Sequence, residues 1–367
     1  MKAFLLFAFL LLSVYCPGQP LEITASDTSS GRIRTAIHFL ERYLHSFENK
    51  ETPDYAKYWS DADCKRSSQP DDMLYTIQGD VPTYRFCDRP VLFFAHDDGA
   101  YIHLKTLFAS SDTNKHINVW AITNHYVTLN DQPRFISELE LHKANYSVVK
   151  NRNITYHFPT STIFSYVTSN KMLERLQRIE QQWDFRPVDI HYYFATSAAE
   201  LAKMRGMDYN YAMDQTTPSG ITNWEQKTIY CQGLGEGYLH EVLHIYFNPL
   251  YEQSPMCHAL IYYLAGGIGK DFNWMIRHMN KYLLAHPDID LNNYETLQSE
   301  DPMLHIDYVT KGLLCKMMDE KDGVPGLKRA LQYKTVADLL QKEFRIDPAN
   351  TDTFLKSTFK RYENKGN

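Results

Sequence analysis

The segment His240-Glu241-Val242-Leu243-His244 places two imidazoles four residues apart with a carboxylate between them. On an α-helix, residues four apart lie one turn from each other on the same face. Two neutral histidines in that arrangement can bind one Zn²⁺ ion at roughly 2.0–2.1 Å. Glu241 lies beside them and can act as a general base on a water molecule that the metal activates. The segment therefore predicts a zinc site with a catalytic glutamate.

The residues around this motif predict that it lies on a buried helix. Its other positions are strongly apolar: Leu239, Val242, Leu243, Ile245, Tyr246 and Phe247. Three glycines precede the segment, at 233, 235 and 237, and Asn248-Pro249 is expected to end the helix. Burying two histidines and a glutamate is costly unless they are paired or bound to a metal. The alternative is a core helix whose histidines form hydrogen bonds with neighbouring groups.

The N-terminus has the pattern of a secretory signal peptide. Lys2 supplies a positive charge, and the charge-free apolar run from Ala3 to Tyr15 ends at Cys16-Pro17. This run is shorter than the roughly 20 residues that span a bilayer. We therefore expect cleavage of residues 1–19 and export to the periplasm or the extracellular space. Cys16 is not expected to carry a lipid, because Tyr15 stands where a lipoprotein signal needs a small residue.

Composition excludes several classes of partner. Hydrophobic residues make up 44% of the chain and aromatic residues 14%, which is ample for a core. The net charge of −6 is mild, and no basic run is present. We therefore expect neither nucleic acid nor an anionic membrane surface as a partner. Beyond the signal run, no apolar segment approaches the length that membrane insertion requires.

The cysteines give only a weak indication of disulfide bonds. Five cysteines follow the expected signal peptide, at positions 64, 87, 231, 257 and 315. In an exported protein, Cys64–Cys87 and Cys231–Cys257 could form disulfides, and the odd number leaves at least one free thiol.

The first part of the chain predicts a small α+β domain over residues 22–150. Residues 31–49 have the apolar spacing of an amphipathic helix, and residues 50–72 read as loop with one short helix. Short strand-like runs separated by turn residues then follow at 91–95, 101–107, 116–122 and 134–142. One helix followed by a curled antiparallel sheet resembles the ketosteroid-isomerase-like cone fold. Alternatively, these strands extend one large α+β domain.

The second part, residues 151–367, predicts a domain in which strands give way to helices. Strands are expected at 154–158 and 188–194, with helices at 165–183 and 197–205. A stretch bearing glycine and threonine, 208–230, ends in a strand at 227–230 just before the motif helix. After Pro249 we expect helices at 256–265, 271–285, 304–319, 324–332, 335–344 and 350–362.

This order of elements is similar to that of the gluzincin (peptidase MA-like) metallopeptidases, in particular exported bacterial members of unassigned substrate. The resemblance covers Ile154 to Tyr362 and includes Tyr156-His157-Phe158-Pro159, an expected edge strand at Thr228-Ile229-Tyr230, and the motif helix. Its specific element is the five-residue zinc motif. The resemblance implies a zincin-like domain, bound Zn²⁺ and peptidase activity.

The third zinc ligand departs from that family. Gluzincins use a glutamate from the next helix, whereas the segment from Cys257 to Gly267 contains none. Counting back from Gly266-Gly267 puts His258 at the ligand position, which gives three histidines, a set that catalytic zinc accepts. Counting by the glycine-containing motif puts Gly266 there and leaves no ligand. Two nearby carboxylates, Glu252 and Asp271, could substitute.

The resemblance also implies roles for individual side chains. Glu241 would take a proton from the attacking water and pass it to the leaving amine. Tyr308 stands where related enzymes present a hydroxyl to the developing oxyanion, although a packing role is the alternative. Phe247 and Leu250 stand where metzincins have a glycine and a third ligand, which excludes that variant.

The sequence thus predicts an exported zinc-dependent hydrolase of α+β fold, with His240, His244 and His258 as ligands and Glu241 and Tyr308 as catalytic groups. A catalytically silent binding protein is the alternative, because the glutamate that the family uses as third ligand is missing.

Overall fold

The computed structural model describes residues 21–25, 28–47, 53–75, 87–112, 116–211 and 218–364. The expected signal peptide and Cys16 lie outside the described residues. The chain divides into two compact units, one of residues 1–144 with 202–214 and the other of residues 145–201 with 215–367. Each unit combines helices with a mixed sheet, so the fold is α+β, as the sequence predicted.

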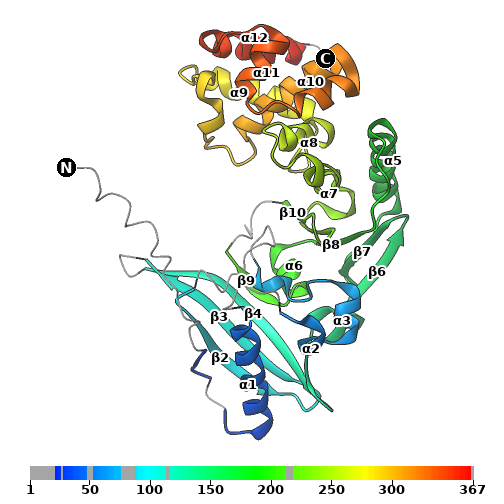
Figure 1. Cartoon of the computed structure of the whole chain (residues 1–367), viewed down its shortest axis with the longest axis vertical. Coiled ribbons are helices and arrows are strands. Elements are labelled where there is room, and N and C mark those ends of the chain that lie inside the picture. The colour runs from blue at the N-terminus through cyan, green and yellow to red at the C-terminus, as the bar shows by residue number, and fades with distance from the viewer. Residues whose placement is uncertain are drawn as a thin grey trace, which may run out of the picture. The chain divides into compact units, whose positions relative to one another are not determined.

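The first unit is a sheet crossed by one long helix (Figure 1). The strands run in the order β1-β2-β3-β4-β5, with β9 also paired to β4. The elements are β1 (Glu22–Ile23), α1 (Gly31–His45), α2 (Tyr55–Tyr58), α3 (Asp61–Arg66), β2 (Arg89–Asp97), β3 (Ile102–Ser111), β4 (Ile117–Leu129), β5 (Pro133–Ile136), α4 (Glu138–Leu141) and β9 (Met207–Asn210). The predicted helix is confirmed as α1, and its apolar positions Ile33, Ile37, Leu40 and Leu44 are buried.

Two predictions for this unit were wrong in detail. The segment 134–142 was expected to be one strand, but β5 ends at Ile136 and α4 follows it. The side chain of Ser137 accepts a hydrogen bond from the backbone N–H of Glu140, which starts the helix. A serine followed three residues later by a glutamate is a helix-start signal that outweighs the alternating pattern. In addition, two short helices, α2 and α3, occupy the segment where one was expected.

The second unit begins with a five-stranded sheet in the order β10-β11-β8-β7-β6. The three central strands are parallel, and β10 and β6 are antiparallel to their neighbours. The elements are β6 (Tyr146–Asn151), β7 (Ile154–Pro159), α5 (Tyr166–Trp183), β8 (Ile190–Ala195), α6 (Ala198–Met204), which spans the boundary between the units, β10 (Ser219–Asn223) and β11 (Thr228–Gln232). The segment Thr228–Tyr230, expected at the edge of the sheet, is interior. The edge strand is β10, whose glycine and threonine gave no strand signal.

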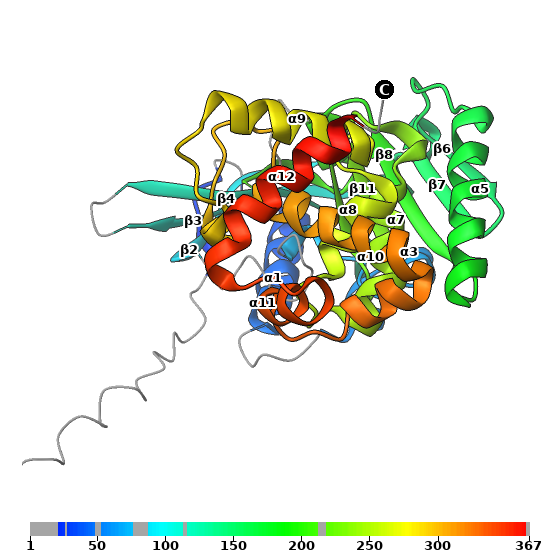
Figure 2. The same cartoon turned by 90° about the horizontal axis from the view of Figure 1, so that it is seen from above.

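The rest of the second unit is helical (Figure 2). Its helices are α7 (Leu239–Tyr251), α8 (Cys257–Ala265), α9 (Phe272–Ala285), α10 (Ile306–Ala330), α11 (Val336–Leu339) and α12 (Thr351–Asn364), with a π-helical turn at Leu340–Phe344. The two predicted helices, 304–319 and 324–332, correspond to the two parts of α10, which meet at a kink where Gly323 has non-helical backbone angles. The helix α7 also continues past Pro249, because a proline in the last turn removes only one backbone hydrogen bond.

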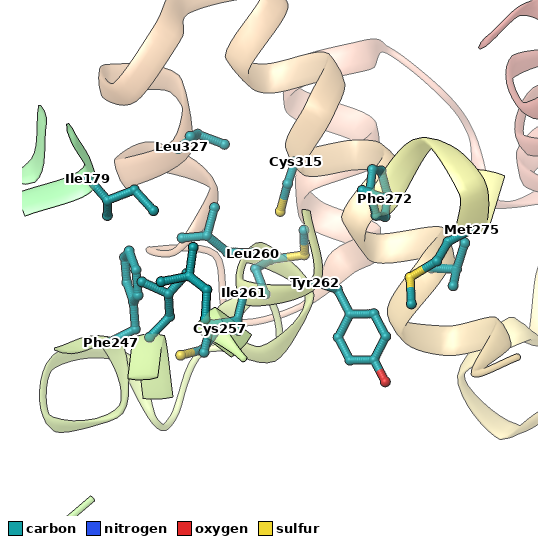
Figure 3. Packing of buried hydrophobic residues seen from close by; sticks show 14 of the residues in the cluster. Ile179, Phe247, Cys257, Leu260, Ile261, Tyr262, Phe272, Met275, Cys315 and Leu327 are labelled. Atoms are coloured by element: carbon teal, nitrogen blue, oxygen red, sulfur yellow. The ribbon is translucent and has the colours of Figure 1, made fainter. Parts of the chain in front are cut away.

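One hydrophobic core joins these helices to the sheet. Residues Ile154, Tyr192 and Ile229 of the sheet belong to the same cluster as residues of α5, α7, α8 and α10. Figure 3 shows the part of this core around α8, where Leu260 and Ile261 lie among residues of the neighbouring helices. Tyr262 also belongs to this cluster, and its ring points away from Leu260 and Ile261 (Figure 3). Among the described residues, no helix combines the length and apolar character that crossing a bilayer requires.

Neither of the two possible disulfides is formed. All five cysteines from Cys64 to Cys315 are free thiols. Cys231 is buried on β11, whereas Cys257 begins α8 and its thiol donates a weak hydrogen bond to Asn248. These thiols therefore fill interior space, as free cysteines commonly do.

A buried carboxyl lies in the first unit. The side chain of Asp71 is fully buried and accepts a hydrogen bond from the Tyr43 hydroxyl, which in turn accepts one from the Trp59 ring nitrogen. Burial raises the pKa of Asp71 from 3.8 to about 7, against the opposing effect of hydrogen bonds from Tyr43 and Tyr55. The folded chain therefore holds this proton more tightly than the unfolded chain does.

We expect Asp71→Asn to remove a pH dependence of stability. Since the pKa of Asp71 is raised in the folded state, Asp71 contributes most to the free energy of unfolding below about pH 4. This contribution is lost as the pH rises towards about 7. The loss amounts to up to about 4 kcal/mol. Chemical unfolding of both proteins between pH 4 and 8 measures this, and parallel profiles for parent and variant would contradict it.

Candidate metal centre

The helix α7 carries the predicted ligands on one face. His240 and Glu241 are 4% and 6% exposed, and His244 is half-buried. Val242, Leu243 and Phe247 lie in the core and hold the helix against its neighbours. The sequence prediction of a buried helix is thus confirmed, and the polar groups it carries need partners.

Each histidine on α7 has an acceptor at its Nδ1 atom. His240 Nδ1 lies 2.6 Å from the carbonyl oxygen of Gly266, and His244 Nδ1 lies 3.1 Å from Asn248 Oδ1. Both partners are oxygens, which only accept, so in this arrangement Nδ1 carries the proton in each neutral ring. In each neutral ring the Nε2 atom is then unprotonated and carries a free lone pair.

These two lone pairs face each other. The distance between His240 Nε2 and His244 Nε2 is 3.3 Å. Two acceptors at that separation repel unless a cation lies between them. For ligands about 2.05 Å from a tetrahedral zinc ion, the expected separation is roughly 3.3 Å. The pair therefore fits a metal ion.

His258 completes the group. It lies on α8, and the three histidines each offer a nitrogen within 4.8 Å of the others. Of the alternatives that the sequence left open, Glu252 is exposed at the end of α7 and Asp271 caps α9 by accepting from Trp274. His258 is thus the third residue of a group that could hold a metal ion.

Burial keeps two of the three histidines, His240 and His258, neutral. Burial lowers the pKa of His240 well below its usual value, and the neighbouring His244 and His258 lower it further. Burial, with His244 and His305, also lowers the pKa of His258 to about 3. Because a histidine must lose its proton to bind a metal, both rings are ready to do so at neutral pH.

Glu241 is held next to the group. Burial raises the pKa of its carboxyl, and His244 together with a hydrogen bond from Thr222 opposes that shift. The Thr222 hydroxyl lies 2.7 Å from Glu241 Oε2. A carboxylate whose pKa is moved towards neutrality is suited to taking up and releasing a proton.

Aromatic rings surround the three histidines. Tyr238 is stacked on His240, with ring centroids 5.6 Å apart, and the edge of Tyr262 meets the same imidazole. Tyr308, in the first turn of α10, packs on His258 with ring centroids 4.2 Å apart. The structure therefore places Tyr308 beside the third histidine, where its ring has a packing role.

Gly266 has two functions here. It ends α8 with a positive φ of 79°, a conformation that glycine adopts without strain. A Cβ atom at this position would lie 1.9 Å from the carbonyl oxygen of Lys270, so only glycine fits. The same residue supplies the carbonyl that orients His240, a role that nothing in the sequence indicated.

No known family model, curated protein or solved structure matches this chain. The interpretation of the site therefore depends on its geometry. Sequence reasoning found His240, Glu241, His244 and His258, but it missed the orienting groups on Asn248 and Thr222.

Replacing His258 should weaken metal binding. We expect His258→Ala to raise the dissociation constant for Zn²⁺ by at least roughly a hundredfold, because even the loss of a group that only orients a ligand costs 10–100-fold. His286→Ala is the control, since it removes an exposed histidine from the end of α9. Competitive zinc titration measures both, and equal affinity in parent and His258→Ala would exclude His258 as a ligand.

Asn248→Ala should release the orientation of His244. In the parent, long-range ¹H–¹⁵N NMR spectra should show the proton of His244 on Nδ1, and in the variant a mixture of tautomers. Zinc affinity should fall about 10–100-fold with it. Asn170→Ala, on the exposed surface of α5, should change neither. An unchanged tautomer in Asn248→Ala would contradict this role.

Proposed function

We propose that this protein is a zinc-dependent hydrolase, and specifically a peptidase of the gluzincin type. The observation that carries the proposal is the convergence of three imidazoles on one point beside a buried carboxylate. A peptide or protein is the proposed substrate.

Zinc is the proposed metal because of the donor set. Three neutral imidazoles and one open position are a common catalytic zinc site. The separation of the two Nε2 atoms on α7 also agrees with tetrahedral coordination. When bound, zinc would supply Lewis acidity and make a water molecule more acidic. A neutral third ligand in place of a glutamate would leave more positive charge at the metal.

The residues of the chain would do the remaining work. Glu241 would accept the proton from the attacking water and deliver it to the nitrogen of the leaving amine, so that it ends the cycle as it began. The rings of Tyr238, Tyr262 and Tyr308 would limit the access of bulk water, which strengthens electrostatic interactions within the site. The hydroxyl of Tyr308 is proposed to stabilise the oxyanion.

The arrangement of the second unit supports a zincin-like fold. An antiparallel edge strand, β10, is followed by β11 and the motif helix α7, and the next helix supplies the third histidine. The first unit, with α1 across a mainly antiparallel sheet, is proposed to be a cone of the ketosteroid-isomerase-like type. Export, proposed from residues 1–19, would place both units outside the cytoplasm.

The test is to compare the parent with Glu241→Gln. The parent should contain about one zinc per chain and cleave a quenched peptide library, whereas the variant should keep its zinc and lose activity by roughly 10²–10⁴-fold. Elemental analysis gives the zinc content of both. A parent without zinc, or a variant as active as the parent, would overturn the proposal. Zinc without any hydrolysis would instead favour the silent binding protein.

A further inference from the structure

The edge strand β10 contacts the proposed general base through two of its residues. Gly220 and Thr222 are two positions apart on the strand, so they face the same side of the sheet. Both lie against Glu241 of the helix α7. Neither residue was singled out by the sequence.

Gly220 leaves room for the glutamate side chain. A Cβ atom at this position would lie 2.5 Å from Glu241 Cγ and 3.0 Å from Glu241 Cδ. It would also lie 2.9 Å from Cε1 of the Tyr238 ring. Any larger residue would therefore displace the side chain that the mechanism requires.

Thr222 supplies a hydrogen bond to the same side chain. Its hydroxyl oxygen lies 2.7 Å from Glu241 Oε2 and 2.9 Å from the backbone carbonyl oxygen of Glu241. The hydroxyl has one proton, and a carboxylate is the stronger acceptor of the two. A buried carboxylate without a donor is costly, so this bond also stabilises the charged form in place.

We propose that β10 is a positioning strand, in which Gly220 and Thr222 together fix the conformation of the Glu241 side chain. The bond to Thr222 engages Oε2 and leaves Oε1 as the oxygen that exchanges the proton. A glutamate side chain has three rotatable bonds, and a catalytic group must be held within about 0.5 Å of its working position. This inference rests on the proposed function for its catalytic meaning.

The first experiment distinguishes the effect of the Thr222 hydroxyl from the effect of the branched shape of the side chain. Thr222→Val keeps the branched shape, and we expect it to lower kcat about 10–100-fold with KM and zinc content nearly unchanged. Thr222→Ser restores the hydroxyl and should recover most of the activity. The control is Thr228→Val on β11, whose hydroxyl bonds to the carbonyl oxygen of Gln226. Parental activity in Thr222→Val, or equal losses in the valine and serine variants, would overturn the inference.

The second experiment does not depend on activity. We expect Thr222→Val and Gly220→Ala each to lower the denaturation midpoint of the parent. In a protein that already carries Glu241→Ala, each substitution should lower the denaturation midpoint by less than about half of its effect in the parent, because the side chain that it acts on is gone. Equal shifts in both backgrounds would overturn the inference even in an active protein. If the parent binds no zinc, the proposed function fails. The difference between the midpoint shifts in the two backgrounds would still show whether β10 fixes the Glu241 side chain.

Discussion

The structure of the site depends on one electrostatic constraint, the approach of two imidazole lone pairs to 3.3 Å. In each ring the acceptor at Nδ1 keeps the proton on that nitrogen and leaves the lone pair on Nε2. This acceptor is the Gly266 carbonyl for His240 and the Asn248 amide oxygen for His244. Neither nitrogen can relieve the repulsion by donating a proton. A metal ion between the two nitrogens could turn this repulsion into binding, and His258 offers a third nitrogen to the same group.

The fold of the second unit holds the groups that orient these side chains. The orienting groups come from different elements, since Asn248 lies on α7, Gly266 ends α8, and Thr222 lies on β10. The hydrophobic core packs α7 and α8 together, and β10 is attached to that core through its pairing with β11. The same burial lowers the pKa of His240 and His258 and raises the pKa of Glu241, so one physical cause acts on both kinds of group.

The sequence predicted the parts of this site that depend on local spacing. The motif His240–His244 needs only one helical turn, and the amphipathic patterns of α1 and α5 were similarly local. His258 was one of several alternatives, because choosing among them requires the packing of α8 against α7. Thr222 was missed because its strand contains glycine and polar residues, and its partner Glu241 is 19 positions away. The pairing of β9 with β4 in the first unit has no local signal either.

The most direct test is a crystal structure of the protein grown with Zn²⁺, with diffraction measured on both sides of the zinc absorption edge. The account predicts one strong anomalous peak within about 2.0–2.1 Å of a nitrogen of each of His240, His244 and His258. The Nδ1 atoms of the first two should still donate to Gly266 and Asn248. Rings turned away from one another, with no anomalous peak between them at saturating zinc, would contradict the account.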